Sequence, residues 1–117
     1  MKHIRWNEIE AEKLSPLLQR QFVAGENLTV ARFVLKKGLI VPTHSHPNEQ
    51  VTYIVEGALK FLIQGKEIVV AAGEALCIPP NIPHSAEALE DTLNIDVFHP
   101  QRADWNNQTD DYLRGQK

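Results

Sequence analysis

Short apolar runs separated by glycine, proline and asparagine constrain the fold of this chain more than any other feature. The runs cover residues 21–24, 28–36, 50–56, 59–63, 67–71, 75–78, 84–89 and 92–99. Runs this short and closely spaced, with no long helical pattern between them, are typical of antiparallel strands joined by tight turns. The sequence therefore predicts an all-β jelly-roll barrel.

The two ends of the chain depart from this pattern. Residues 8–14 predict a short helix that ends before Pro16, so residues 1–20 are expected to form an N-terminal arm. From residue 104 on the chain is polar, which predicts a short helix or a loose arm within a C-terminal tail of residues 101–117. A chain of 117 residues has room for one core. We expect one domain over residues 1–117, with its barrel at about 21–100.

Charge and cysteine content exclude some classes of protein. The 12 Lys and Arg residues against 15 Asp and Glu residues give a net charge of −3, whereas a nucleic-acid groove needs a basic stripe. No apolar run approaches the ~18 residues of a membrane helix, and the first residues lack the apolar stretch of a secretory signal. The single cysteine, Cys77, fits a reducing compartment. We expect a cytoplasmic protein without nucleic-acid or membrane partners, with Cys77 buried as a small apolar side chain.

The run 28–35 is apolar on both faces, apart from Thr29 and Arg32. A strand with two apolar faces has to be covered on both sides. One cover is the core of the barrel. The other is either a second subunit, which makes the protein a homodimer, or the N-terminal segment, and the pattern favours the homodimer.

Three histidines and a glutamine are placed as metal ligands would be. Residues i and i+2 of an extended chain point to the same side, so His44 and His46 can face one point. A bend after Pro47 can return the Gln50 amide to that point, and His84 directly follows a proline-rich turn. Isolated histidines are more often surface or core groups. Three neutral imidazoles with one oxygen donor nevertheless suit a divalent metal ion.

The glycines and prolines around these residues resemble the two motifs of the cupin superfamily. The first motif, G-x5-H-x-H-x3-E-x6-G, has every spacing matched by Gly38, His44, His46, Gln50 and Gly57. The second, G-x5-P-x-G-x2-H-x3-N, is matched in spacing by Gly73, Pro79, Asn81, His84 and Ala88. The resemblance implies a double-stranded β-helix barrel with a divalent metal on His44, His46, Gln50 and His84. Nickel, zinc, manganese and iron all accept these donors.

Gln50 stands where the cupin motif usually has a glutamate ligand, and this departure bears on the chemistry. A neutral amide leaves the full charge of a dication uncompensated, which makes the metal a stronger Lewis acid and a better anchor for an anionic substrate. It also compensates a high-valent iron less well, which disfavours oxygenation. A local shift of one residue would replace Gln50 by Glu49, although the spacing to Gly57 favours Gln50.

The last apolar run carries a candidate acid–base group. Asn94, Asp96 and Phe98 alternate with an apolar set and lie on one face of the expected strand. Taken alone, this face could simply be solvated. In a cupin barrel one face of this strand looks into the metal cavity, so Asp96 would be a carboxylate near the metal, suited to general acid–base catalysis.

The segments HSHPNEQ, YIVEG, IPPNIPH and the terminal DVF-x-P-x-R-x-D resemble the pectin-degradation KdgF group of cupins. That resemblance implies a metal-dependent opening of 4,5-unsaturated uronates, which are small anionic sugars, to linear 5-keto-4-deoxyuronate. It assigns turnover to Asp96 and a place in the cavity to Phe98. Arg102 is either the partner of the substrate carboxylate or part of a structural ion pair with Asp104 or another acid.

Two other functions remain open from the sequence. A cupin can bind a small acid or sugar without catalysis, or it can be another enzyme such as a dioxygenase, a decarboxylase or a sugar isomerase. The metal ligands support all three functions, because one fold hosts many chemistries. Asp96 with Phe98 distinguishes the uronate enzyme from a binding protein.

Overall fold

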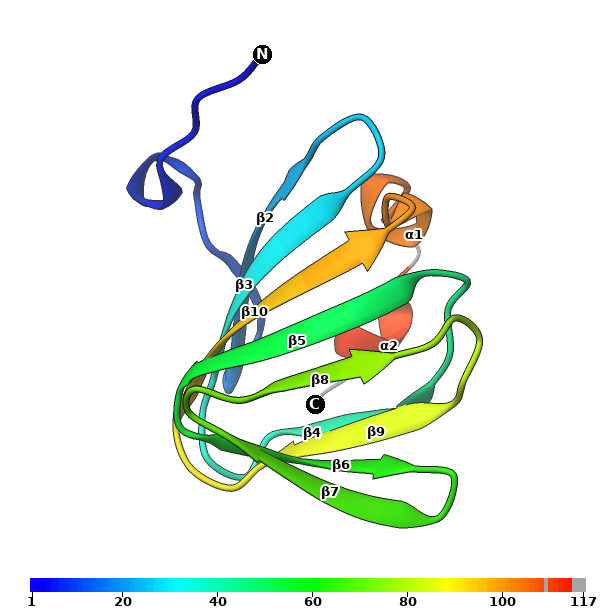
Figure 1. Ribbon diagram of the computed structural model, residues 1–117. Helices are drawn as coiled ribbons and strands as arrows, with labels where there is room; N and C mark the ends of the chain where they lie inside the picture. The colour runs from blue at the N-terminus through cyan, green and yellow to red at the C-terminus, as the bar shows by residue number, and fades with distance from the viewer. Residues whose placement is uncertain (109, 115–117) are drawn as a thin grey trace.

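Two antiparallel sheets form the barrel in a computed structural model that describes residues 1–108 and 110–114 (Figure 1). The six-stranded sheet has the order β1 (Glu12–Ser15), β2 (Leu18–Ala24), β3 (Thr29–Leu35), β10 (Thr92–His99), β5 (Glu49–Glu56), β8 (Ala75–Ile78). The four-stranded sheet has the order β4 (Ile40–His44), β9 (His84–Ala88), β6 (Ala58–Ile63), β7 (Lys66–Ala71). This all-β fold confirms the predicted class, and residues 109 and 115–117 of the expected tail lie outside the described residues.

Alternation along the strands builds the core between the two sheets. In β3 the residues Thr29, Ala31, Phe33 and Leu35 are buried, while the residues between them are partly exposed. Strand β10 follows the same rule. One face of each strand therefore points into the barrel, as the period of two along an extended chain requires.

The prediction of a helix over residues 8–14 is wrong. A short 3-10 helix covers Trp6–Glu8, and β1 then pairs with β2 as a hairpin whose turn contains Pro16. The strand is favoured because Leu14 is buried and the Glu12 carboxylate accepts hydrogen bonds from Arg20 across the hairpin. The sheet therefore begins earlier than the expected boundary at residue 21.

Strand β4 lies between the apolar runs 28–36 and 50–56, where no strand was expected. Its Pro42 lacks a backbone N–H, but β4 is the edge strand of its sheet, where proline is tolerated. Cys77 also differs from expectation, because it is exposed. Strand β8 is an edge strand as well, and its inward position is taken by Ile78.

The C-terminal tail forms two short helices at the open end of the barrel, α1 (Ala103–Asn106) and α2 (Asp111–Arg114) (Figure 1). Helix α2 contacts β1 and β4, which belong to different sheets. Trp105 and Leu113 are buried in the core. The described part of the tail is therefore packed as a closure between the sheets. No helix among the described residues is long and apolar enough to cross a membrane.

Candidate metal centre

The ladder between β4 and β9 brings distant histidines together. His44 is the last residue of β4 and pairs directly with His84, the first residue of β9. His46 follows in the next loop, which a backbone hydrogen bond of 2.8 Å from Asn81 N to His46 O ties to the turn before β9. The possible ligand atoms of His44, His46 and His84 all lie within 4.8 Å of one another. The expected convergence of the three imidazoles is therefore present.

A hydrogen bond to a backbone carbonyl fixes the tautomer of each ring. The Nδ1 atoms lie 2.8 Å from Pro42 O for His44, 3.1 Å from Asn48 O for His46 and 2.8 Å from Ile82 O for His84. Because a carbonyl oxygen only accepts, each Nδ1 carries the proton and donates. Each Nε2 therefore keeps a lone pair for a ligand, which is the arrangement that metal-binding histidines use.

Gln50 completes the cluster from β5. Its Oε1 lies 3.0 Å from His46 Nε2, while its Nε2 donates to Thr52 Oγ1 at 2.8 Å. Since Nδ1 of His46 holds the ring proton, Nε2 and Oε1 are two acceptors facing each other. Such a pair needs a cation or a proton close to both atoms. Glu49, the alternative ligand, is exposed, so the structure places Gln50 at the cluster.

The histidines are held in the neutral form that a metal requires. Burial lowers the pKa of His44 and of His46 to about 4, and the Arg102 cation contributes to the lowering at both. Burial also lowers the pKa of His84. The Nε2 atom of His84 is buried without a hydrogen-bond partner among the described residues. A divalent metal ion fits these residues, because it would occupy the lone pairs that the protein leaves without donors.

Strand β10 places its acid beside this cluster. Asn94, Asp96 and Phe98 point inward and are buried, which excludes a solvated face. In the ladder with β5, Asp96 lies opposite Thr52 and Phe98 lies opposite Gln50. Burial raises the pKa of Asp96 to about 6, against hydrogen bonds from Thr52 and Asn94 that lower it. Such a carboxyl can hold or release a proton near neutral pH.

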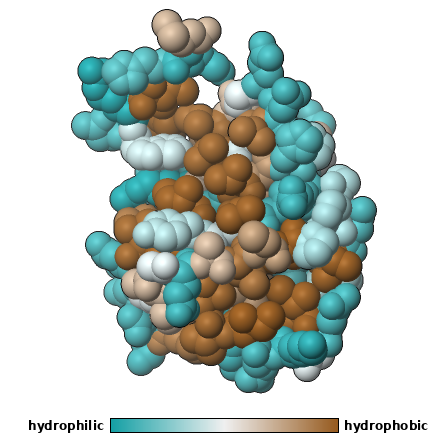
Figure 2. All heavy atoms as spheres, viewed as in Figure 1, coloured by the Kyte–Doolittle hydropathy of each residue, from teal (hydrophilic) through white to brown (hydrophobic). Residues whose placement is uncertain are grey.

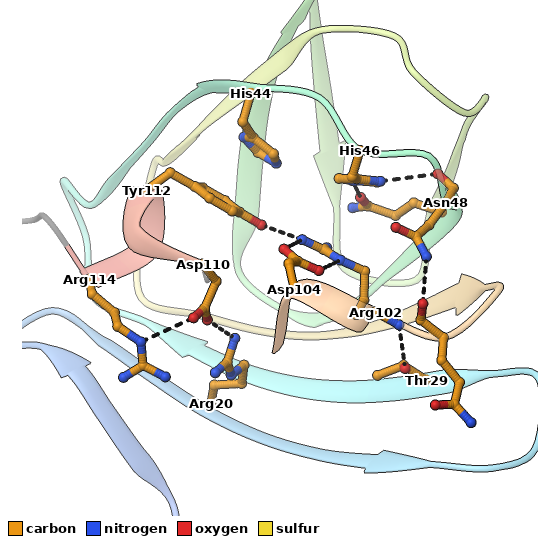
Figure 3. A network of polar contacts seen from close by, with 12 residues as sticks. Arg20, Thr29, His44, His46, Asn48, Arg102, Asp104, Asp110, Tyr112 and Arg114 are labelled. Atoms are coloured by element: carbon orange, nitrogen blue, oxygen red, sulfur yellow. Dashed lines mark hydrogen bonds and ion pairs between the residues drawn. The ribbon is translucent and has the colours of Figure 1, made fainter. Parts of the chain in front are cut away.

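Arg102 is buried and bridges the barrel to the C-terminal tail (Figure 3). Its Nε and Nη2 atoms bind the Asp104 carboxylate at 2.8 and 2.6 Å, and Nη2 also contacts the Tyr112 hydroxyl at 2.7 Å. Its guanidinium lies over the Phe98 ring at 4.7 Å. The expected ion pair with Asp104 is present. Arg102 also lines the cavity that contains the candidate ligands.

Tyr112 belongs to the site although no pattern in the sequence singles it out. Its ring stacks on His44 with centroids 4.3 Å apart and planes inclined by 20°.

Asn48 was missed as well. It receives the His46 N–H on its carbonyl oxygen (Figure 3). Its side chain donates to the carbonyls of Pro100 and Gln101. The position of Asn48 between the candidate ligands in HSHPNEQ was a signal that could have identified it. Tyr112 had no such signal, because a four-residue helix is too short to show a periodic pattern.

One cavity unites these groups. It is lined by His44, Gln50, His84, Asp96, Arg102 and Tyr112, together with apolar side chains from both sheets. Its volume is about 60 Å³, which gives room for an ion and a few waters. The seven predicted site residues are thus brought together around the cavity, except that His46 reaches it through Gln50.

Comparisons with known proteins agree with this architecture. The pectin degradation protein KdgF of Dickeya dadantii is 28% identical over 102 residues, covering 85% of this chain and 93% of that protein. The structure of KdgF from Halomonas sp. has a TM-score of 0.79 at 29% identity, covering 85% of this chain and 94% of that one. An RmlC-like cupin from Shewanella frigidimarina has a TM-score of 0.82 at 30% identity, with coverages of 90% and 96%.

The family match covers the strands that build the site. Residues 31–98 match the family described as "Cupin domain", a span that includes His44, His46, Gln50, His84 and Asp96. The match extends over more than half of the chain. With the barrel topology and the two glycine-spaced histidine motifs, it shows that the chain belongs to the cupin family.

Proposed function

We propose that this protein is a metal-dependent enzyme for small sugar acids that opens the ring of 4,5-unsaturated uronates to 5-keto-4-deoxyuronate. The observation that carries the proposal is the buried Asp96 in the same cavity as the candidate metal ligands. The similarity to KdgF proteins supports the substrate class. The coarser conclusion, a cupin with a three-histidine cluster, does not depend on the substrate.

The proposed reaction is an isomerisation that needs proton movement and positioning. The anomeric hydroxyl loses its proton, the bond from C1 to the ring oxygen breaks, and C1 becomes an aldehyde. The ring oxygen becomes the C5 ketone when C4 gains a proton, so no water or redox partner is consumed. Asp96, with a pKa raised to about 6 by burial, is suited to take the first proton and to deliver one to C4.

The other cavity residues would hold the sugar. A divalent metal on His44, His46, Gln50 and His84 would supply Lewis-acid polarisation of a substrate oxygen. Arg102 offers a cation at the cavity wall, and Phe98 offers an apolar surface beside Asp96. A volume of about 60 Å³ is too small for a monosaccharide acid, so the cavity has to widen when the substrate enters.

The test follows the loss of the ultraviolet absorbance of an unsaturated uronate. Purified protein of measured metal content should accelerate the loss beyond the spontaneous rate. Asp96→Ala should keep its metal and lose about 10²–10⁴-fold in rate, the usual contribution of a general acid–base. Glu67→Ala, which removes an exposed carboxylate from β7 on the other sheet, is the matched control and should behave as the wild type.

The metal ligands are tested in the same assay. His84→Ala should lose metal and activity together. If metal-loaded wild-type protein gives no acceleration, the enzyme assignment is wrong, and uronate binding measured by calorimetry would then support a non-catalytic binding cupin. If Asp96→Ala keeps full activity, the acid–base role of Asp96 is wrong.

A further inference from the structure

The indole N–H of Trp105 is a buried donor at the cavity. Trp105 of α1 is only 3% exposed, it lines the cavity, and its Nε1 atom has no hydrogen-bond partner among the described residues. An indole N–H can only donate, so a metal ion cannot satisfy it. A buried N–H without an acceptor costs free energy and calls for an explanation in a native fold. An oxygen supplied by a ligand would remove that cost.

The surroundings of Trp105 hold its ring in place. The ring meets the Phe98 ring edge-on, with centroids 5.1 Å apart. The guanidinium of Arg102 lies 4.5 Å from the centre of the Trp105 ring, and the guanidinium of Arg20 lies 4.4 Å from it. Packing and cation–π contacts therefore set the direction of the N–H, and no hydrogen bond is needed to orient it.

The Trp105 N–H faces an oxygen that Arg102 already binds. Arg102 Nη2 donates to the Tyr112 hydroxyl oxygen at 2.7 Å (Figure 3). Burial raises the pKa of Tyr112, and both the Arg102 charge and the Trp105 N–H act against this rise. That direction is expected of two donors beside the phenol oxygen. The start of α1 thus directs two donors at one oxygen, although only Arg102 completes a hydrogen bond to it.

Arg102 presents its charge to the cavity. Its side chain is 2% exposed, whereas the side chain of Asp104, which binds Nε and Nη2, is 29% exposed. Besides burial, the Arg102 charge lowers the pKa of His46, and it opposes the rise in the pKa of Asp96. The cavity side of the Arg102–Asp104 pair is therefore positive, which favours an anion there.

These two donors lie apart from the apolar surface of the barrel. Figure 2 shows hydrophobic residues gathered in a band on the viewed outer face, with hydrophilic residues on both sides of it. Apolar side chains have no donors for an acid. Because Arg102 and Trp105 are both buried, an acid reaches them only through the cavity.

We propose that Trp105 Nε1 and Arg102 Nη2 bind the carboxylate of the substrate, and that the Tyr112 oxygen holds their place until the carboxylate displaces it. The inference rests on the proposed function, because it takes the substrate to be a uronate. A carboxylate has two oxygens and can accept from both donors, whereas the phenol oxygen satisfies Arg102 alone. Trp105 is thus a specificity-determining residue for acids over neutral sugars.

This subsite would orient the substrate toward Asp96. Phe98 follows Asp96 by two residues on the inner face of β10, and the Arg102 guanidinium lies 4.7 Å from the centre of its ring. Residues two apart on a strand are separated by about 7 Å. In a 4,5-unsaturated uronate the carboxyl carbon is bonded to C5, which is bonded in turn to C4, the atom that gains the proton. A carboxylate on Arg102 and Trp105 therefore sets the double bond between the subsite and Asp96.

Nuclear magnetic resonance of the indole N–H groups tests the subsite. The chain has two tryptophans, so Trp6→Phe assigns the resonance of Trp105. In zinc-loaded protein, D-galacturonate should shift the Trp105 N–H resonance in a saturable manner and leave that of Trp6 unchanged. Galacturonate lacks the 4,5-double bond, so the result does not depend on turnover. D-galactose, which has no carboxylate, is the control ligand and should leave both resonances unchanged.

Matched variants measure the contribution of each group to galacturonate affinity, determined by titration calorimetry. Trp105→Phe keeps an aromatic ring and removes the N–H, so it should weaken binding at least about 10-fold, as expected for a hydrogen bond to a charged group. Tyr112→Phe keeps the ring over His44 and removes the competing oxygen, so it should tighten binding about 3-fold. Trp6→Phe removes an indole N–H that does not line the cavity and should bind as the wild type does. Bound zinc should be the same in all four proteins.

Every outcome supports or overturns the subsite. A Trp105 resonance that galacturonate leaves unchanged overturns it, and an equal shift with galactose does so too, because a sugar hydroxyl would then be the acceptor. Weaker binding in Tyr112→Phe overturns the displacement. If Trp105→Phe does not fold, the resonance of the wild type still decides. The ultraviolet assay reports on the proposed function separately. A shifted resonance without turnover keeps the subsite and removes the enzyme assignment, and turnover without a shift does the reverse.

Discussion

At the scale of single residues, the placement of Asp96 costs stability in return for a titratable group in the cavity. Its carboxyl is buried on β10, and Asn94 Nδ2 donates to its Oδ1 at 2.9 Å. Burial still dominates and raises the pKa of Asp96 to about 6 from 3.8. Each pKa unit corresponds to about 1.4 kcal/mol of preference for the neutral acid. If Asp96 served only to fill space in the core, a neutral side chain would do so without this free-energy cost.

We expect Asp96→Asn to stabilise the metal-free protein near neutral pH. The folded state binds the Asp96 proton more tightly than the unfolded state does, so wild-type stability falls as pH rises from 3.8 to about 6. Asparagine cannot ionise and avoids this loss. Relative to the wild type, the variant should gain up to about 3 kcal/mol above the folded pKa and lose that gain below 3.8.

Urea unfolding of both proteins across this pH window measures the difference. The protein must first be stripped of metal by a chelator, since a dication in the cavity would stabilise the Asp96 anion. Two stability curves that stay parallel from acid to neutral pH would show that Asp96 is not held in its neutral form by burial.

At the scale of elements, a tight turn joins the two sheets behind the site. Gly57 lies between β5 and β6 with φ +91°, a conformation that side chains rarely adopt. A Cβ there would meet Asp91 O at 2.4 Å and Thr92 Oγ1 at 2.5 Å. Gly38 has the same φ of +91° but has nothing within 4 Å of an added Cβ. Two matching glycines of the first motif thus serve different physical needs.

This pair separates backbone strain from steric overlap. Gly38→Ala should cost about 1–2 kcal/mol, because only the left-handed conformation is penalised. Gly57→Ala should cost about 1–3 kcal/mol more, since the backbone of residues 91 and 92 has to move as well. Chemical denaturation of both variants measures the two free energies of unfolding. Equal losses would mean that the contact with Asp91 and Thr92 is relieved without cost.

The same scale shows what sequence patterns can predict. All eight apolar runs correspond to strands within a few residues, because alternation and glycine-bounded length are local properties. Strand β4 was missed because Pro42 and His44 do not look like a strand, and pairing with β9 overrides their local preference. Strand β1 was missed because its charges form part of a hairpin pair with Arg20. Such pairing depends on a partner strand that the local sequence pattern does not reveal.

At the scale of the whole molecule, the site depends on contacts between the two ends of the chain. The sequence predicts that the histidines, Gln50 and Asp96 lie together, because motif spacing and strand parity are visible in it. The closure of the cavity by the C-terminal tail could not be predicted. Arg20 on β2 and Asp110 before α2 are 90 residues apart in sequence, yet Nη1 and Oδ2 lie 2.7 Å from each other with both side chains fully buried (Figure 3). Neither residue stands out in its local pattern.

The Arg20–Asp110 pair holds the tail that carries Tyr112 over His44. Burial alone would raise the pKa of Asp110, but the ion pair with Arg20 outweighs it and lowers that pKa, so the carboxylate is charged at neutral pH. Arg114 also binds Asp110 at 3.1 Å. Two cations therefore converge on one buried carboxylate that joins β2 to the tail.

Removing this carboxylate should loosen the closure and destabilise the fold. Breaking a buried pair costs about 3–5 kcal/mol, and Glu12, 3.1 Å from Arg20, should reduce the loss for Asp110→Ala to about 2–3 kcal/mol. Glu8→Ala breaks the exposed Arg5–Glu8 pair instead and should cost less than about 1 kcal/mol. Denaturation of the full chain measures both losses.

Extraction of bound metal by a chelator should be faster in Asp110→Ala and unchanged in Glu8→Ala, because only the first variant frees the helix that covers His44. Unchanged extraction in a destabilised Asp110→Ala would mean that the ion pair supports the barrel without closing its mouth.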